Sequence, residues 1–223
     1  MKVKLISHSQ APDTDDSALD LIAYCARVSN PSNQNNKETN EKLVKYLIKH
    51  KHWSPLEMVS VCLEIETTRD IARQILRHRS FSFQEFSQRY ADPTQELDFE
   101  IREARLQDPK NRQNSIDIDT GDDEQRRIAE DFRMSQKKLL REVTQLYQWA
   151  IDKGIAKEQA RAILPEGNTI SRMYVNGTLR SWIHFIELRS GNGTQLEHME
   201  IARECAKVIA DIFPLANDYI ENN

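Results

Sequence analysis

The segment MVSVCLEIETTRDIARQILRHR, residues 58–79, contains the clearest β-strand of the chain and a helical pattern directly after it. In residues 58–66 every second side chain is aliphatic, which gives the strand one apolar face: Val59, Val61, Leu63 and Ile65. Thr67 or Thr68 can cap the helix that follows. A strand with one apolar face must be covered by another layer of structure. The segment therefore predicts a half-buried sheet packed against helices.

The rest of the chain is rich in helical patterns and poor in strands. Residues 95–125 are polar and irregular, and we predict a variable or mobile excursion there. Strands and helices alternate too sparsely for a doubly wound parallel sheet. We predict an α+β fold, one helix-rich domain over residues 1–223 with a small, mainly antiparallel sheet. The predicted helices are 17–29, 37–51, 67–79, 123–152, 157–164, 178–189 and 194–213, and the predicted strands are 3–7, 58–66 and an extended piece with a turn at 169–177.

Charge and hydropathy exclude several classes of protein. The 223 residues carry a formal net charge of −4, whereas a protein that binds nucleic acid usually presents a basic face. The chain has no apolar run long enough to span a membrane, and its first residues do not resemble a secretory signal. We expect a cytoplasmic protein that binds neither nucleic acid nor membranes, so any site for an anion must be local.

Cysteine and histidine spacing points away from thiol and metal chemistry. Cys25, Cys62 and Cys205 are far apart and lie among apolar neighbours, which is typical of reduced, buried thiols. His50 and His52 have no nearby partners that would complete a metal site. We predict no metal and no cysteine nucleophile.

Arginines are concentrated around RHRSFSFQEFSQRY, residues 77–90. On the predicted helix before it, Arg69, Arg73 and Arg77 recur every four residues, with Gln74 and His78 in the adjacent row. A guanidinium group offers a planar fork of donors that suits a phosphate, a carboxylate or the edge of a pyrimidine. An ion-pair network on the surface would give the same pattern, so both interpretations stay open on these residues alone.

A second group of candidate residues lies on the predicted helix 178–189. Arg180 and His184 are four residues apart and can meet one ligand. Arg189 lies nine positions after Arg180, which is about 900° of helix rotation and places the two on opposite sides. If both are functional, they serve different parts of a site or sites on different subunits, which favours an oligomer with composite sites.

Arg77-His78-Arg79, seven further residues, Ser87, one residue and Arg89 form the pattern R-H-R-x7-S-x-R. In this the chain resembles the flavin-dependent thymidylate synthases. Similar segments include HWSPLEM at 52–58, YCARVS at 24–29, ARAILP at 160–165 and LRSWIHFIELR at 179–189. The resemblance covers most of the chain apart from roughly residues 95–140.

The resemblance implies an FAD enzyme that methylates dUMP to dTMP. The carbon unit comes from 5,10-methylenetetrahydrofolate, and the hydride comes from NADPH by way of the flavin. Such an enzyme needs no cysteine nucleophile, in agreement with the cysteine pattern. The family fold is a homotetramer of α+β subunits that holds flavin and nucleotide where subunits meet.

The same resemblance assigns roles to individual residues. Arg189 is expected to polarise the uracil ring and is the predicted catalytic residue. Met58, Gln84 and Thr178 depart from the residues usual in the family. The predicted FAD contacts are Ser54, Arg77, His78, Arg79, Glu85, Thr178, Arg180 and His184. The predicted dUMP contacts are Gln74, Arg77, Glu85, Phe86, Ser87, Gln88, Arg89, Arg161 and Arg189.

Two hypotheses from other classes remain. A non-catalytic regulatory protein that binds nucleotides could use the same anion site without flavin. An RNA-binding module would bind with an affinity that falls steeply with salt, and the net negative charge argues against it.

Overall fold

Four antiparallel strands form the central sheet of the computed structural model, which describes residues 1–191 and 193–220. Their order across the sheet is β1 (Lys2–His8), β2 (Ser60–Thr68), β6 (Ile170–Thr178) and β3 (Ser82–Glu85). The two long strands pair along their whole length, from Ser60 opposite Thr178 to Thr68 opposite Ile170. Because they run in opposite directions, the chain leaves them at opposite ends of the sheet.

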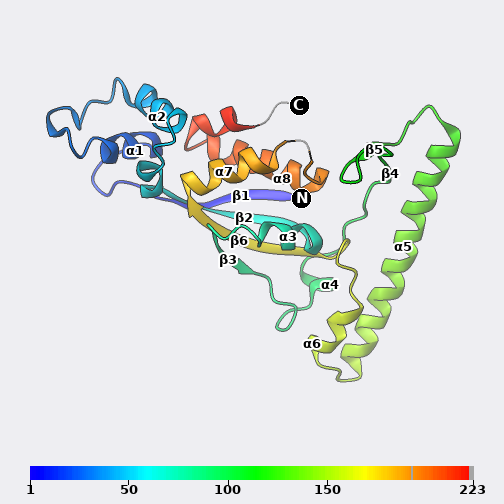
Figure 1. The fold of residues 1–223 in the computed structure, drawn as a ribbon. Helices are drawn as coiled ribbons and strands as arrows, with labels where there is room; N and C mark the ends of the chain where they lie inside the picture. Colours follow the sequence, from blue (N-terminus) through cyan, green and yellow to red (C-terminus); the bar gives the residue numbers. More distant parts are fainter. Residues whose placement is uncertain (192, 221–223) are drawn as a thin grey trace.

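Helices cover one face of this sheet, and one long helix stands apart from it. In Figure 1, α7 and α8 lie across the sheet, α1 and α2 lie together near one end, and α5 extends along the far side of the molecule with α6 at its end. A small hairpin of β4 and β5 lies near the start of α5. The helices are α1 (Ala18–Ala26), α2 (Asn40–Lys49), α3 (Arg69–Ile75), α4 (Pro93–Glu96), α5 (Asp123–Asp152), α6 (Lys157–Ala160), α7 (Leu179–Arg189) and α8 (Leu196–Ala210), and the hairpin strands are β4 (Arg105–Gln107) and β5 (Ser115–Asp117).

The alternation in β2 produces the predicted half-buried sheet. Val61, Leu63 and Ile65 are fully buried in the main core, while the residues between them are only half-buried. Helices α3, α7 and α8 supply the other side of this core. The Trp182 indole on α7 donates a hydrogen bond of 3.0 Å to the Val61 carbonyl, which ties the helix to β2. The predicted α+β fold with a small antiparallel sheet is confirmed.

Several local predictions need correction. Helix α3 ends at Ile75, so 76–79 leave the helix early. Strand β3 lies inside the arginine-rich stretch and was missed, because four residues carry too little periodicity and the pairing partner, β6, is distant in sequence. Strand β6 runs without a turn. The 95–125 excursion contains the end of α4, the β4–β5 hairpin and the start of α5. No helix in the described ranges is long and apolar enough to cross a membrane.

Gly177 on β6 allows the ring of Phe81 to lie directly against the sheet. A Cβ added at this glycine would stand 2.3 Å from Phe81 Cδ1, well inside van der Waals contact. The ring is buried and also packs on Trp182, with centroids 4.5 Å apart. Phe81 thereby connects the end of the R-H-R segment to the core.

We expect Gly177→Ala to lower the free energy of unfolding by about 1–3 kcal/mol, because the new methyl group displaces a buried ring. Urea denaturation followed by tryptophan fluorescence measures this change. Gly167→Ala is the control, since a Cβ there meets nothing within 4 Å. Equal stability of the two variants would contradict the close packing of Phe81.

Candidate active site

Strand β3 divides the arginine-rich motif into two halves. It pairs with β6 from Ser82 opposite Asn176 to Glu85 opposite Met173. Residues 77–79 precede this strand and residues 87–89 follow it, so the two halves lie beyond opposite ends of a strand about 13 Å long. The first half lies toward the end of β6 where α7 begins, and the second half lies toward its start.

His78 and Arg189 meet at the centre of the candidate site. Arg189 Nε donates a hydrogen bond of 3.0 Å to His78 Nε2, and the His78 ring packs edge-on against Phe185, with centroids 5.0 Å apart. Burial and the neighbouring Arg189 charge lower the pKa of His78 to about 4. His78 is therefore a neutral acceptor near pH 7, with its proton on Nδ1. The structure brings the predicted catalytic arginine onto a predicted cofactor-binding histidine.

Gln74 lies beside this pair and contacts two residues that the sequence analysis missed. Its amide nitrogen donates to the Gln195 side-chain oxygen at 2.8 Å, and its oxygen is 3.2 Å from His198 Nδ1. His198 is fully buried, and burial with the charge of Arg189 lowers its pKa to about 3. A lone histidine on an amphipathic helix gives no functional signal in sequence, because packing in the core explains it equally well.

A second cluster forms where α7 begins. The Thr178 hydroxyl donates to Glu57 Oε2 at 2.9 Å, and Arg180 Nη1 lies 2.5 Å from Glu57 Oε1. These hydrogen bonds, led by the one from Arg180, hold the pKa of the Glu57 carboxyl below its usual range, although burial opposes them. His184 packs edge-on against Trp53, with centroids 4.5 Å apart. Arg180 and Arg189 therefore belong to different clusters, as their helical spacing predicted.

Glu57 is a functional candidate that the sequence analysis passed over. It lies in the segment HWSPLEM, from which only the exposed Ser54 was taken. The carboxylate joins the 52–58 turn to the start of α7. The Thr178 hydroxyl also accepts from the Ser181 backbone N–H and so caps the helix. Thr178 departs from the residue usual in the family, but its side chain still donates a hydrogen bond to Glu57 and caps α7.

The arginine row along α3 is partly an ion-pair network. Arg73 forms a salt bridge with Glu166, and Arg69 Nε lies 3.8 Å from the same carboxylate. Arg77 and Arg79 are exposed, and neither guanidinium forms an ion pair with any residue in 1–191 or 193–220. Both interpretations that the sequence left open therefore apply. Arg69 and Arg73 belong to an ion-pair network, and the unpaired Arg77 and Arg79, on either side of His78, are available for a ligand.

The second half of the motif lies against β6 and α6. Glu85 Oε1 accepts a hydrogen bond of 2.7 Å from Ser171 and one of 3.4 Å from Arg69. Beyond it, the Phe86 backbone N–H donates to the Arg172 carbonyl at 2.8 Å.

The loop after β3 carries Arg89 and a buried glutamine, Gln88, whose side-chain N–H groups lack a hydrogen-bond partner among the described residues. Arg89 lies 3.5 Å from Glu158 on α6, and Arg161 follows Glu158 by about one helical turn. An unsatisfied buried donor next to Arg89 in the chain suits an anionic ligand.

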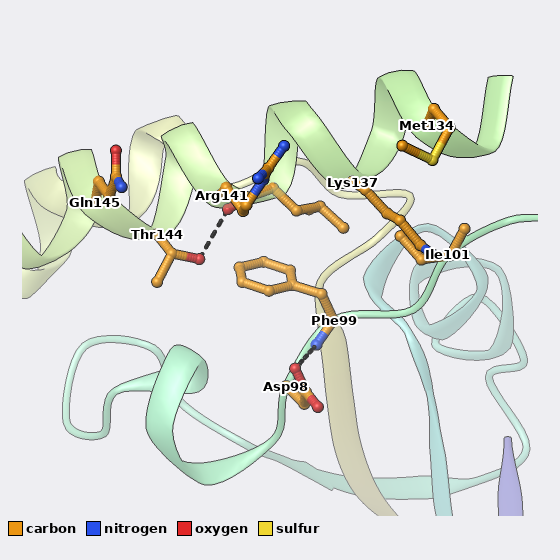
Figure 2. Close-up of a pocket in the computed structure, with 9 residues that line it drawn as sticks. Asp98, Phe99, Ile101, Met134, Lys137, Arg141, Thr144 and Gln145 are labelled. Carbon is orange, nitrogen blue, oxygen red and sulfur yellow. Dashed lines mark hydrogen bonds between the residues drawn. The ribbon is translucent and has the colours of Figure 1, made fainter. Parts of the chain in front are cut away.

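Two cysteine thiols and a cavity beside α5 take no part in this site. Burial raises the pKa of the thiols of Cys62 and Cys205, so neither is an activated nucleophile. A cavity of about 670 Å³ lies between the Phe99 segment and α5, and none of its lining residues is a predicted site residue (Figure 2). Among the predicted site residues, Ser54, Arg77, Arg79 and Arg89 are exposed, and the others are half-buried or buried.

Comparison with known proteins defines the class of this chain. Residues 4–215 match the profile of the Thy1 family, described as thymidylate synthase complementing protein. The chain belongs to this family. It is 49% identical over 215 residues to a probable flavin-dependent thymidylate synthase of Paramecium bursaria Chlorella virus 1, with 96% of each chain covered. It is 50% identical over 194 residues to the flavin-dependent thymidylate synthase of Synechocystis sp., covering 87% of this chain and 85% of the relative.

A solved structure resembles the whole subunit. PolB from Streptomyces cacaoi, a UMP/dUMP methylase crystallised with 5-Br dUMP, aligns with a TM-score of 0.75 at 26% identity. The alignment covers 98% of this chain and 93% of that chain. The family resemblance that rested on R-H-R-x7-S-x-R is confirmed.

We expect the two neutral histidines to make the protein less stable as the pH falls from 7 to 5. Their folded-state pKa values of about 4 and about 3 lie below the usual value near 6.5, so in this window the unfolded chain binds more protons. Each histidine can lower the free energy of unfolding by up to about 2 kcal/mol over the window. Urea unfolding at several pH values measures the slope, and His198→Leu is expected to make it shallower.

His52→Leu is the matched control, because His52 is exposed and should leave the slope unchanged. Parallel slopes for the wild-type protein and His198→Leu would contradict a neutral buried His198.

Proposed function

We propose that this chain is an FAD-dependent thymidylate synthase, which methylates dUMP to dTMP with 5,10-methylenetetrahydrofolate as carbon donor and NADPH as reductant. Membership of the Thy1 family and near 50% identity to flavin-dependent thymidylate synthases support this activity, and the likeness to a dUMP methylase agrees with it. The observation in the structure that carries it is the Arg189–His78 hydrogen bond beside Gln74. It joins the cofactor and nucleotide residues into one site without an activated thiol.

The first half of the motif and the start of α7 have the donors that FAD requires. When bound, FAD carries the hydride between NADPH and the pyrimidine. Arg77 and Arg79 are exposed and unpaired in the described ranges, which leaves their guanidinium groups available for a pyrophosphate. Glu57 is contacted directly by Thr178 and Arg180. His184 packs on Trp53, which directly precedes Ser54 in the same segment. These four predicted residues, Ser54, Thr178, Arg180 and His184, would contact the remainder of the cofactor.

The second half of the motif suits the nucleotide phosphate. The Ser87 hydroxyl, Arg89 and Arg161 provide donors, and Gln88 holds an unused buried one. The motif positions Glu85 and Phe86 lie between this end and the centre of the site. Gln74 and Arg189 would meet the pyrimidine, where the fixed positive charge of Arg189 stabilises negative charge that develops on the ring oxygen.

A homotetramer with sites shared between subunits accounts for the open geometry. Helix α5 stands away from the central sheet (Figure 1). Large apolar side chains are exposed along its length. Exposed apolar surface of this extent marks an interaction site. The two clusters on α7 face different sides of the helix, so a second subunit can complete each of them. The exposed residues on α5 are Ile128, Phe132, Met134, Leu139, Leu146 and Trp149.

The visible spectrum of the purified protein tests the proposed cofactor. We expect a flavin band near ~450 nm that bleaches on anaerobic addition of NADPH, as reduction of a flavin requires. Titration with dUMP and an assay for dTMP complete the test. A protein that stays colourless with added FAD and yet binds dUMP would instead be the nucleotide-binding regulator.

We expect Arg189→Ala to reduce the rate of dTMP formation roughly 100-fold or more, because it removes a preorganised charge from the reacting ring. Steady-state kinetics on FAD-loaded protein measure the change. Lys45→Ala is the control, since Lys45 pairs with Glu41 on the exposed face of α2. Activity of Arg189→Ala close to that of Lys45→Ala would reject Arg189 as the catalytic residue.

A further inference from the structure

The side-chain amide of Gln74 is held from two sides by the start of α8. Its nitrogen donates to Gln195 at 2.8 Å, and its oxygen lies 3.2 Å from His198 Nδ1. Because an amide oxygen can only accept a hydrogen bond, His198 is the donor in the second contact and carries its proton on Nδ1. These two contacts fix the orientation of the Gln74 amide, with its nitrogen toward Gln195 and its oxygen toward His198.

His198 connects Gln74 to the central pair of the site. Its ring is fully buried, with centroids 6.2 Å from His78 and 5.7 Å from Phe185. Its Nε2 has no hydrogen-bond partner within the described residues. A proton on this nitrogen would place a buried cation close to the charge of Arg189. The ring therefore stays neutral, and its one N–H is the one that faces Gln74.

The residue before His198 anchors the same turn to the 95–125 excursion. Glu197 Oε2 accepts a hydrogen bond of 2.9 Å from Gln195. Its Oε1 accepts one of 2.6 Å from Arg105 and lies 2.9 Å from Arg102 Nη1. The side chains of all three charged residues are at most 16% exposed. Removing the Glu197 carboxylate would leave largely buried guanidinium groups without this partner, which costs more than breaking a surface ion pair.

Arg102 also ties this turn to the helix that carries Gln74. Its Nη2 donates to both oxygens of Asp70, in the first turn of α3, at 2.9 and 3.1 Å. Helices α3 and α8 are thus joined at two places, through Arg102 near their starts and through Gln74 one turn further along α3. The spacing between Gln74 and His198 therefore depends on the contacts of Arg102 with Asp70 and Glu197.

We propose that His198 and Glu197 are positioning residues that orient the Gln74 amide for the pyrimidine of dUMP, and that Arg102 and Arg105 take part in nucleotide binding by holding Glu197. The inference rests on the proposed function, because it takes dUMP as the ligand of Gln74. It gives the excursion a role in the site, although none of its residues belongs to the R-H-R-x7-S-x-R pattern.

The test is calorimetric titration of FAD-loaded protein with dUMP, with KM and kcat measured on the same samples. His198→Leu removes the donor to Gln74 and is expected to raise Kd and KM for dUMP about tenfold, the effect of one lost hydrogen bond to an oriented group. The value of kcat is expected to stay within about threefold, because the lost contact serves binding. Glu197→Gln is expected to shift Kd in the same direction.

Two variants separate positioning from a general loss of structure. His198→Asn keeps a side-chain N–H close to the Nδ1 position and is expected to restore dUMP affinity to within about threefold of wild type. Glu204→Gln removes the partner of Lys207 on the same helix and is expected to leave Kd unchanged. Circular dichroism and FAD content confirm that each variant is folded.

Each outcome decides the proposal. Wild-type affinity in His198→Leu, or equally weak binding in His198→Asn, would overturn the role of His198. Unchanged affinity in Glu197→Gln would overturn the role of Arg102 and Arg105. If the wild-type holoprotein itself failed to bind dUMP, the proposed function would fall, and this inference with it.

Discussion

The antiparallel pairing of β2 with β6 is the constraint on which the site depends. Each strand leads directly into a helix, and the register sends α3 and α7 off from opposite ends of the sheet. The Leu179 backbone N–H donates to the Val59 carbonyl at 2.9 Å, so α7 starts in continuation of the sheet. The ends of the two helices then come together over its apolar face, where His78 meets Arg189. A shift of one residue in this pairing would turn the inward side chains outward and separate that pair.

The electrostatics of the His78–Arg189 pair depend on a half-buried arginine that lies close to two neutral histidines. Arg189 stays charged, while burial and that charge keep His78 and His198 neutral. The histidines can then accept from the arginine or donate to Gln74 without adding repulsion. Carboxylates are held further out, Glu57 at the start of α7 and Glu197 at the start of α8. An anionic ligand therefore meets a positive centre within a subunit whose net charge is negative.

The sequence predicted the architecture well wherever a periodic pattern was long. The alternation in β2 and the apolar stripes of α5, α7 and α8 each produced an element close to the observed one. Prediction failed for β3 and the β4–β5 hairpin, because short strands depend on hydrogen bonds to partners elsewhere in the chain. It also extended α3 past Ile75, since the R-H-R segment continues the helical spacing although the chain turns there to bring Phe81 beneath Gly177.

The sequence by itself determined the family and the reaction class, because five polar residues at set spacing form a chemical pattern that does not depend on knowing the fold. It also argued against a cysteine nucleophile, and the raised pKa of the Cys62 and Cys205 thiols agrees with that prediction for these two residues. Only the tertiary structure decided which arginines are free, since Arg73 is paired with Glu166 and Arg77 has no ion-pair partner in the described ranges. It alone revealed Glu57, Glu197 and His198. These residues act through contacts between segments far apart in the chain, and spacing along a sequence carries no information about such contacts.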